Sequence, residues 1–413
     1  MAIFKKNSLK ISDDKRTQAA ELTLRQSIYP LCLVTILFFL WGFSYGLLDT
    51  LNKHFQNTLG ITRARSSGLQ AAYFGAYPLA SLGHANWILR HYGYKPVFIW
   101  GLCLYAIVCG PPRYAEIRIN ISQAFNGIGT VVAPVLGSYV FFLKTADDPK
   151  ALTNVQWVYL AIACFCFALA VVFYFSPLPE ITDADMAFQA EETHANADVK
   201  PFHKQYRLFH ATFAQFCYTG AHLGAKFLAG AQGAFAIGRF AGVGLMKFVR
   251  PRWVFLFYLT MCIVFIAPSI TQHGNSGMAM LYITLFFESI CFPTIVALGM
   301  RGLGKHTKRG SGFIVGAVSG GACVPPLLGA AADLNGSTAK AMSVPLCFFV
   351  AAWSYALCVN FVPSYRDTAD KFTTTKIGLE TGVSKDEEMG GEKGVTERTE
   401  RLAVKDTGEI EKM

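Results

Sequence analysis

Long apolar stretches, joined by short polar connections, make up most of this chain. The first set lies at about 30–52, 67–89, 96–110, 118–143 and 155–175. The second set lies at about 206–221, 224–249, 253–270, 277–300, 310–333 and 342–363. A run of roughly 20 apolar residues is long enough to cross the hydrocarbon core of a bilayer as a helix. The pattern therefore predicts an all-α integral membrane protein with two helical sets.

The polar segments define the expected domains. Residues 1–29 carry more Lys and Arg than Asp and Glu, which favours the cytoplasmic side. Residues 176–205 form a polar, partly acidic segment, and residues 366–413 are rich in Lys, Glu, Thr and Gly with almost no aromatics. The composition of residues 366–413 is typical of disorder. We expect a cytoplasmic tail (1–29), two helix bundles (30–175 and 206–365), a cytoplasmic linker (176–205) and a disordered cytoplasmic tail (366–413).

Composition narrows the classes of function. The hydrophobic fraction is 53% and the charged fraction 15%, whereas soluble domains carry about a quarter charged residues. The net charge of +10 fits basic loops inside the cell better than nucleic-acid binding. The 11 cysteines all fall in apolar stretches without metal-ligand spacing. No HExxH, nucleophile-elbow or P-loop motif is present. We therefore expect neither an enzyme nor a bound metal or cofactor.

Two short similarities indicate an internal duplication. The basic connection His91–Phe98 resembles Lys247–Phe255, and each leads into the next apolar stretch. Pro134-Val-Leu-Gly137 resembles Pro326-Leu-Leu-Gly329, each inside a stretch rich in Gly and Ala. Shared composition of membrane helices is the alternative explanation, but the matched order favours duplication, which is common in transporters.

Asp49, Arg239 and Glu288 are charged residues inside apolar stretches, where ionisable groups are costly. Asp49 lies near the end of the first stretch, so it either faces a wet cavity or sits at the outer mouth among lipid headgroups. Arg239 lies deep in its stretch and needs a carboxylate or helix carbonyls as partner. Glu288 lies five residues before Pro293. Three interpretations are open for it: a proton site, a partner of Arg239, or a solvated residue facing the cavity. We assign Arg239 and Glu288 to intramembrane charge pairing or gating.

Several short motifs occur along both halves of the chain. In the first half they are Phe39-Leu-Trp-Gly42, Leu48–Gln56, Gln70–Tyr77, Gly93-Tyr-Lys95 and Arg118–Asn126. In the second half they are Ala214–Tyr218, Gly238-Arg-Phe240, Pro293-Thr-Ile295 and Ser311–Val315. Together these motifs resemble the fucose permease-like sugar/proton symporters of the major facilitator superfamily, and they run in family order from about residue 30 to 365.

The resemblance implies the major facilitator fold: twelve helices in two pseudo-repeated bundles around a cavity that opens alternately to each side. It implies that Asp49 takes and gives the coupling proton, and that Gln123 and Asn126 line the sugar cavity. Gln123 and Asn126 share a helix face, which interhelical packing alone would also explain. Aromatic faces suit the apolar faces of a sugar. The full set of predicted substrate-binding residues is Gln123, Asn126, Trp41, Tyr45, Gln70, Tyr73, Tyr77 and Gln215.

The chain departs from the family pattern at two places. About eleven spans are recognisable, and 96–110 runs directly into Gly110-Pro111 without the family's fourth helix and its glutamate. The seventh helix is truncated near Ala221–Leu223. If 208–249 forms a hairpin turning near Gly220–Gly224, its first arm is stunted. With one span restored before Pro111, every basic loop lies inside. A wrongly joined gene model or a splice form would explain the loss.

We therefore expect a multi-pass protein, with the plasma membrane as its default location, that takes up a monosaccharide of the fucose or hexose class with protons. The proton gradient would supply the coupling ion, and no cofactor is expected. The expected partners are a small-molecule sugar and the lipid bilayer, not nucleic acid, and the chain is expected to be a monomer. The alternative is a non-transporting paralogue, a sugar sensor, or an incomplete gene model without activity.

Overall fold

The computed structural model describes residues 22–59, 63–84, 87, 111–136, 152–175, 183–193, 200–221, 229–272 and 274–375. The predicted span 96–110 lies outside these ranges, and so do the junction residues Gly110, His222 and Leu223. The tails 1–21 and 376–413 lie outside them too. Within the described ranges the elements are helices joined by turns, with no β-strand.

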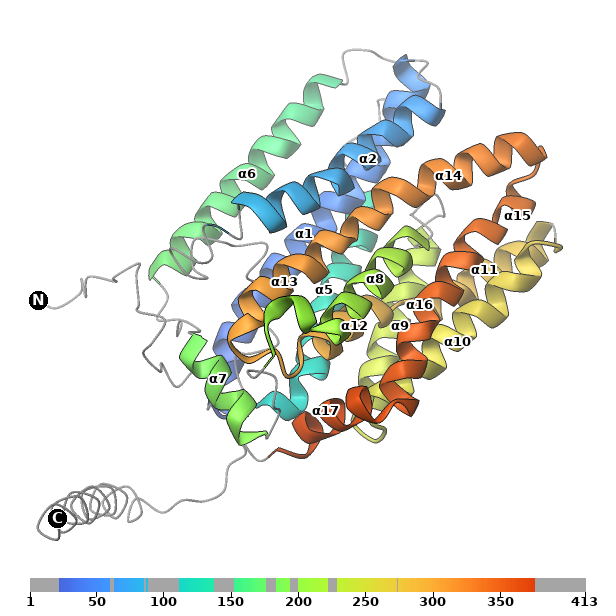
Figure 1. Cartoon of the computed structure of the whole chain (residues 1–413). Coiled ribbons are helices and arrows are strands. Elements are labelled where there is room, and N and C mark those ends of the chain that lie inside the picture. The colour runs from blue at the N-terminus through green and yellow to red at the C-terminus, as the bar shows by residue number, and fades with distance from the viewer. Residues whose placement is uncertain are drawn as a thin grey trace, which may run out of the picture.

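The first half begins with the long helix α1 (Leu24–Leu59). It continues with α2 (Arg63–Pro78), which passes into the π-helical turn η1 (Leu79–His84). A short turn, η2 (Pro112–Tyr114), leads into α5 (Ala115–Leu136), and α6 (Leu152–Phe175) follows. The helices α2, α5 and α6 begin three or four residues before the predicted stretches, whereas α1 extends six residues before and seven residues beyond the predicted stretch 30–52. In Figure 1, α6 lies at one edge of the molecule.

The second half begins after α7 (Asp183–Glu192), a helix inside the predicted linker, and the turn η6 (Phe202–Lys204). It contains α8 (Tyr206–Ala221), α9 (Ala229–Met246) and α10 (Pro251–Ser269). It continues with α11 (Gly274–Glu288), α12 (Cys291–Met300), η7 (Gly304–His306), α13 (Thr307–Gly316), η8 (Ala317–Ser319) and α14 (Gly320–Asn335). It ends with α15 (Thr338–Ala341), α16 (Ser343–Phe361) and α17 (Pro363–Thr374).

The run 208–249 is divided between two helices, α8 and α9. The first of these, α8, has 16 residues, or roughly 24 Å of helix, short of a hydrocarbon core of about 30 Å. Because α8 ends at Ala221 and α9 begins at Ala229, the change of helix falls next to the predicted turn. The short first arm agrees with the hairpin interpretation.

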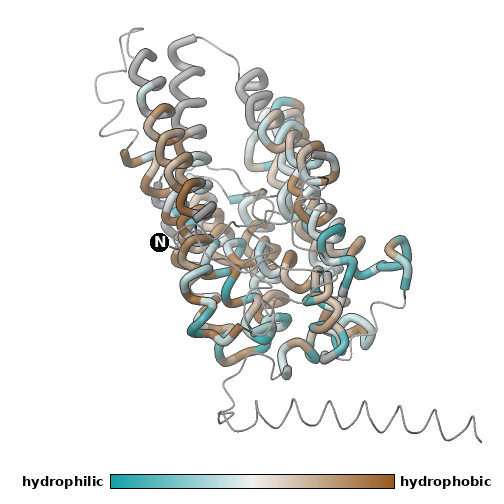
Figure 2. The backbone as a smooth tube through the Cα atoms, turned by 90° about the vertical axis from the view of Figure 1, so that its left-hand side faces the viewer, coloured by the Kyte–Doolittle hydropathy of each residue, from teal (hydrophilic) through white to brown (hydrophobic). Residues whose placement is uncertain are grey.

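Six helical segments of the described part are long and apolar enough to cross a membrane. They are Leu24–Leu47, Pro112–Leu136, Pro251–Ser269, Gly274–Met300, Gly304–Asn335 and Thr338–Phe361. Figure 2 shows hydrophobic stretches along the helices and more hydrophilic segments toward the lower end in that view. This distribution is that of a multi-pass membrane protein.

The fourth of these spans is broken between α11 and α12. Proline lacks a backbone N–H and its ring disturbs the preceding turn. Pro293 therefore cannot donate to the carbonyl oxygen of Ser289, its partner in a regular helix. Two turn residues, Ser289 and Ile290, separate the two helices. The break leaves the carbonyl oxygen of Ser289 without its helical donor inside the protein, within reach of α9.

The two halves repeat one packing device, a close helix crossing through glycine. In the first half a Cβ added to Gly42 of α1 would lie 1.9 Å from the carbonyl oxygen of Asn126 in α5. In the second half a Cβ added to Gly320 of α14 would lie 1.9 Å from the carbonyl oxygen of Phe216 in α8. Small residues let membrane helices approach this closely. The matched crossings agree with the predicted duplication.

A polar seam joins the two halves along one face of α5. Its α5 members recur at intervals of four and three residues, so they lie on one side of the helix. Glu116 pairs with Arg301 at 2.5 Å, and the amide of Asn120 donates to Thr294 at 3.3 Å. The α5 seam consists of Glu116, Asn120, Gln123, Gly127 and Thr130, facing Arg301, Thr294, Arg239, Ala236 and Gln232.

The expectation of a disordered tail from residue 366 is wrong for residues 366–374, which belong to α17. This helix lies across the lower ends of α5 and α16 in Figure 1. Its buried residues Ala369 and Phe372 are three apart and share a face. Asp370 accepts from Arg252 at 2.9 Å and Arg250 at 2.8 Å. Composition averaged over the whole tail concealed this short amphipathic helix.

Candidate functional site

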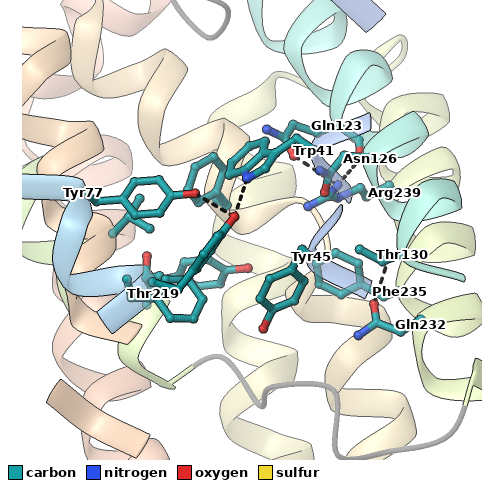
Figure 3. Close-up of a pocket in the computed structure, with 15 residues that line it drawn as sticks. Trp41, Tyr45, Tyr77, Gln123, Asn126, Thr130, Thr219, Gln232, Phe235 and Arg239 are labelled. Atoms are coloured by element: carbon teal, nitrogen blue, oxygen red, sulfur yellow. Dashed lines mark hydrogen bonds between the residues drawn. The ribbon is translucent and has the colours of Figure 1, made fainter. Parts of the chain in front are cut away.

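A cavity that is partly open to solvent lies between the two halves. The first half contributes α1, α2 and α5, and the second half contributes α8, α9, α12 and the turn η8. The lining residues are Trp41, Tyr45, Tyr73, Phe74, Tyr77, Gln123, Asn126, Thr130, Tyr218, Thr219, Gln232, Phe235, Arg239, Phe292 and Val318. Figure 3 shows Tyr77 and Thr219 on one side of this space and Gln123, Asn126 and Arg239 on the other.

The aromatic side of the cavity is built from α1 and α2. The indole N–H of Trp41 donates to the hydroxyl of Tyr73 at 2.9 Å, and the Tyr77 hydroxyl donates to the same oxygen at 3.4 Å. The rings of Tyr45 and Tyr73 lie 5.8 Å apart at a tilt of 40°. These contacts fix the rings, so the cavity presents a largely pre-formed aromatic surface. All four predicted aromatic residues line it.

The amide side of the cavity comes from α5. Gln123 and Asn126 are both lining residues, as predicted. The Asn126 side chain also donates from Nδ2 to the carbonyl oxygen of Phe38 at 3.0 Å. It therefore joins α5 to α1 as well as facing the cavity. Packing and cavity lining, the two interpretations of this pair, both apply to Asn126.

Arg239 of α9 lies beside these amides. Its Nε donates to the carbonyl oxygen of Ser289 at 2.8 Å, the acceptor that Pro293 leaves free. Its Nη1 donates to the backbone carbonyl oxygen of Gln123 and, at 3.3 Å, to the side-chain Oε1 of the same residue. The guanidinium also lies over the ring of Phe235, 4.5 Å from its centroid. Arg239 thus connects the second half to the first at the wall of the cavity.

The predicted pairing of Arg239 with Glu288 is not found among the contacts of the described residues. The hydrogen bonds of Arg239 go to carbonyl and amide oxygens rather than to the Glu288 carboxylate. Glu288 is fully buried in the second half and is not a lining residue. The hydroxyl of Tyr218 donates to its backbone carbonyl at 3.0 Å. Of the alternatives for Arg239, helix carbonyls are the partners found.

Three predicted residues do not contribute a described side chain to the cavity. Gln215 is buried in α8, and its Nε2 donates to the Thr219 hydroxyl at 3.3 Å. It therefore stands behind a lining residue and does not line the cavity itself. A polar residue on an apolar helix faces either a cavity or a neighbouring turn, and the sequence does not separate the two. The backbones of Asp49 and Gln70 belong to α1 and α2, but their side chains lie outside the described residues.

Sequence analysis missed the polar pair Thr130 and Gln232. The hydroxyl of Thr130 donates to Oε1 of Gln232 at 3.3 Å across the two halves. Thr130 lies seven residues after Gln123 and four after Asn126, on the same face of α5. Gln232 is the one amide residue of α9, seven residues before Arg239. The helical spacing from Gln123 was the signal available in the sequence.

Comparison with known proteins gives relatives that are named as sugar transporters. A glucose/galactose transporter of Brucella abortus is 28% identical over 386 positions, covering 78% of this chain and 92% of the relative. An L-fucose-proton symporter of Escherichia coli is 26% identical over 405 positions, covering 79% of this chain and 92% of the relative. No family model matches the chain.

The alignments also contain a large internal difference. Seventy-eight per cent of 413 residues is about 322, so about 64 of the 386 positions aligned with the Brucella relative have no counterpart here. A span needs roughly 20 residues, so the difference is large enough for a span with its loops. The predicted loss of helical segments is in line with this number.

Solved structures show the fold. The crystal structure of a single-residue variant of the Escherichia coli fucose:proton symporter superposes with a TM-score of 0.62 at 23% identity, covering 80% of this chain and 98% of that chain. A second structure of that protein, in the outward conformation, gives a TM-score of 0.58. The chain therefore has the fold of these major facilitator superfamily structures, and as a multi-pass membrane protein it resembles the fucose permease-like sugar/proton symporters.

Proposed function

We propose that the chain is a proton-coupled transporter of a monosaccharide of the fucose or hexose class. The relatives are named as transporters of glucose and galactose or as a fucose–proton symporter. One observation carries the proposal. The cavity between the halves has a fixed aromatic surface on one side and amide and guanidinium groups on the other. The plasma membrane is the proposed location and a monomer the proposed state.

The two sides of the cavity suit the two kinds of surface on a sugar. Apolar C–H faces of a pyranose pack on aromatic rings, and Trp41, Tyr73 and Tyr77 provide these rings. Hydroxyl groups both donate and accept, which amides match because they carry a donor and an acceptor. Gln123 and Asn126 are the proposed sugar-binding amides. Thr130, Thr219 and Gln232 extend the polar side of the cavity.

Alternating access requires that contacts between the halves form and break. The α5 seam joins the halves through hydrogen bonds and one ion pair. Polar contacts of this kind are replaced by water when the halves part, so they permit reversible opening. The rigid helix crossings within each half, at Gly42 and Gly320, keep each half intact during that motion.

Asp49 is the proposed proton-coupling residue. It is a carboxylate at the end of the apolar part of α1, the helix that also carries Trp41 and Tyr45. Protonation and sugar binding on one helix would be linked through the position of that helix. Neither Arg239 nor Glu288 is assigned the coupling role.

The test is sugar uptake by the full chain reconstituted in liposomes. We expect uptake of labelled fucose, glucose or galactose to rise when the outside is acidified. Asp49→Asn is expected to abolish accumulation against a gradient while retaining exchange of sugar across the membrane, because exchange needs no net proton movement. Normal accumulation by Asp49→Asn would remove Asp49 from the mechanism.

The second candidate function is a non-transporting membrane protein. The observation that favours it is that about 64 positions of the alignment with the Brucella transporter have no counterpart in this chain. Sequencing the mature transcript across the codons for Gly110–Pro111 and Ala221–Leu223 separates the explanations. Extra in-frame codons there would mean that the sequence is an incomplete gene model. Without them, saturable sugar binding and no counterflow would support a sensor or a dead paralogue.

A further inference from the structure

The orientation of the Gln123 amide is fixed by Arg239. A guanidinium only donates hydrogen bonds, so the amide must turn its oxygen toward it. Oε1 of Gln123 lies 3.3 Å from Nη1 of Arg239. The reversed amide would set two donors against each other. The amide N–H group is therefore directed away from Arg239, and the assignment follows from chemistry as well as from coordinates.

The Gln123 amide nitrogen is a buried donor in a residue that lines the cavity. Nε2 is enclosed and has no hydrogen-bond partner among the described residues. Gln123 itself is 2% exposed and lines the cavity beside Trp41. A buried donor without an acceptor costs free energy, so a ligand that brings an acceptor recovers that cost. The residue points to a ligand with an accepting oxygen at this place.

Arg239 is itself held from both sides. Its Nε is bound to the carbonyl oxygen of Ser289, which Pro293 leaves without a helical donor. Its Nη1 is bound to the backbone carbonyl of Gln123 as well as to the side chain. The ring of Phe235 covers one face of the guanidinium. These fixed contacts leave Arg239 one orientation, which is what a residue needs to hold another in place.

We propose that Arg239 is a positioning residue of the sugar site, fixing the Gln123 amide so that its N–H donates to an accepting oxygen of the sugar. This inference rests on the proposed function and specifies the substrate class. The sugar needs a hydroxyl or ring oxygen at that place. A deoxy sugar lacking the oxygen, or an amino sugar whose ammonium group only donates, is discriminated against there.

The experiment measures sugar affinity and thermal midpoint for the purified full chain, with fucose, glucose and galactose as probes. Gln123→Glu keeps an oxygen toward Arg239 and replaces only the donor. We expect at least about a tenfold loss of affinity with no fall in the thermal midpoint. Arg239→Lys, which cannot reach both Ser289 and Gln123 as a planar fork, is expected to lose affinity similarly.

A double variant separates positioning from general structure. If Arg239 acts through Gln123, the variant Gln123→Ala with Arg239→Lys binds sugar no more weakly than Gln123→Ala alone. Arg252→Lys is the matched control, because Arg252 is also a buried arginine but bonds Asp370 and Asn360 away from the cavity. It is expected to leave affinity unchanged.

The outcomes of these binding experiments either support or overturn the positioning role of Arg239. Wild-type affinity in Gln123→Glu, or losses that multiply in the double variant, would overturn the positioning role while leaving the transport proposal in place. If the wild-type protein binds none of the three sugars, the proposed function fails instead. Gln123→Glu places a carboxylate beside Arg239, so this variant is expected to fold. The donor role of Gln123 can therefore be tested even where an Arg239 variant does not fold.

Discussion

At the residue scale, the cavity owes its shape to hydrogen bonds among its own side chains. The Tyr73 hydroxyl accepts from both Trp41 and Tyr77, so one oxygen holds three rings. The amide of Asn126 is likewise fixed, by the carbonyl oxygen of Phe38. A site arranged before its ligand arrives loses less conformational entropy on binding. Residues that touch no ligand can therefore still determine affinity.

Tyr73→Phe tests this arrangement. Removing the shared hydroxyl leaves the Trp41 N–H without its acceptor, and the net value of such a bond is about 1 kcal/mol, or roughly fivefold in affinity. We expect sugar affinity to fall by that factor, measured by equilibrium binding. Tyr355→Phe is the control, because Tyr355 is buried in the second half and does not line the cavity. Equal losses in both variants would contradict the role given to Tyr73.

At the element scale, glycines set how closely helices cross. The approach of α14 to α8 depends on Gly320, where an added Cβ would meet the Phe216 carbonyl oxygen at 1.9 Å. Backbone atoms cannot move aside as a flexible side chain can. By contrast, a Cβ added to Gly329 of the same helix has nothing within 4 Å. The two positions therefore differ in the space around the added Cβ atom.

This contrast gives a matched pair of substitutions. We expect Gly320→Ala to force α8 and α14 apart and lower stability by about 1–3 kcal/mol, the usual cost of overpacking. Gly329→Ala is expected to be neutral or slightly stabilising, because alanine is the better helix former by about 1 kcal/mol. Thermal unfolding in detergent measures both. A neutral Gly320→Ala would mean that the crossing is looser than described.

At the scale of the whole molecule, one buried ion pair joins three parts of the chain. Glu116 of α5 and Arg301 at the end of α12 have side chains 0% and 4% exposed. Arg301 also donates to the carbonyl oxygen of Ala369 and, at 3.0 Å, to the hydroxyl of Thr373, both in α17. The first half, the second half and the C-terminal helix therefore meet at a single guanidinium.

Glu116→Gln removes one partner of this pair and leaves the buried arginine charge uncompensated. We expect a loss of about 3 kcal/mol in the free energy of unfolding, in the range for broken buried pairs. Asp367→Asn is the control, because its pair with Arg366 is half exposed and such pairs contribute about 0–1 kcal/mol. Chemical or thermal denaturation compares them. Similar small losses would show that the buried pair does not hold the parts together.

Much of the fold and some of the site followed from the sequence. Apolar stretches located α1, α2, α5, α6 and the second-half helices, because the bilayer requires long apolar helices with internally satisfied backbones. The family resemblance implied that Gln123 and Asn126 line a cavity, and the fit of aromatic rings to sugar faces suggested the four aromatic residues; all six line the cavity. Asp49 and Gln70 stay predictions, since their side chains lie outside the described residues.

The sequence by itself determined which apolar segments are helical, and it placed Arg239 and Glu288 inside such segments, since both results depend on local composition and spacing. Only the tertiary structure decided which buried polar side chains bond to one another. It gave Arg239 the Ser289 carbonyl and Gln123 rather than Glu288, placed Gln215 behind Thr219, and joined Thr130 to Gln232. It also ordered α17 against Arg252 and Arg301. Hydrogen bonds and ion pairs between distant helices depend on how the helices rotate and cross, which composition and periodicity do not specify.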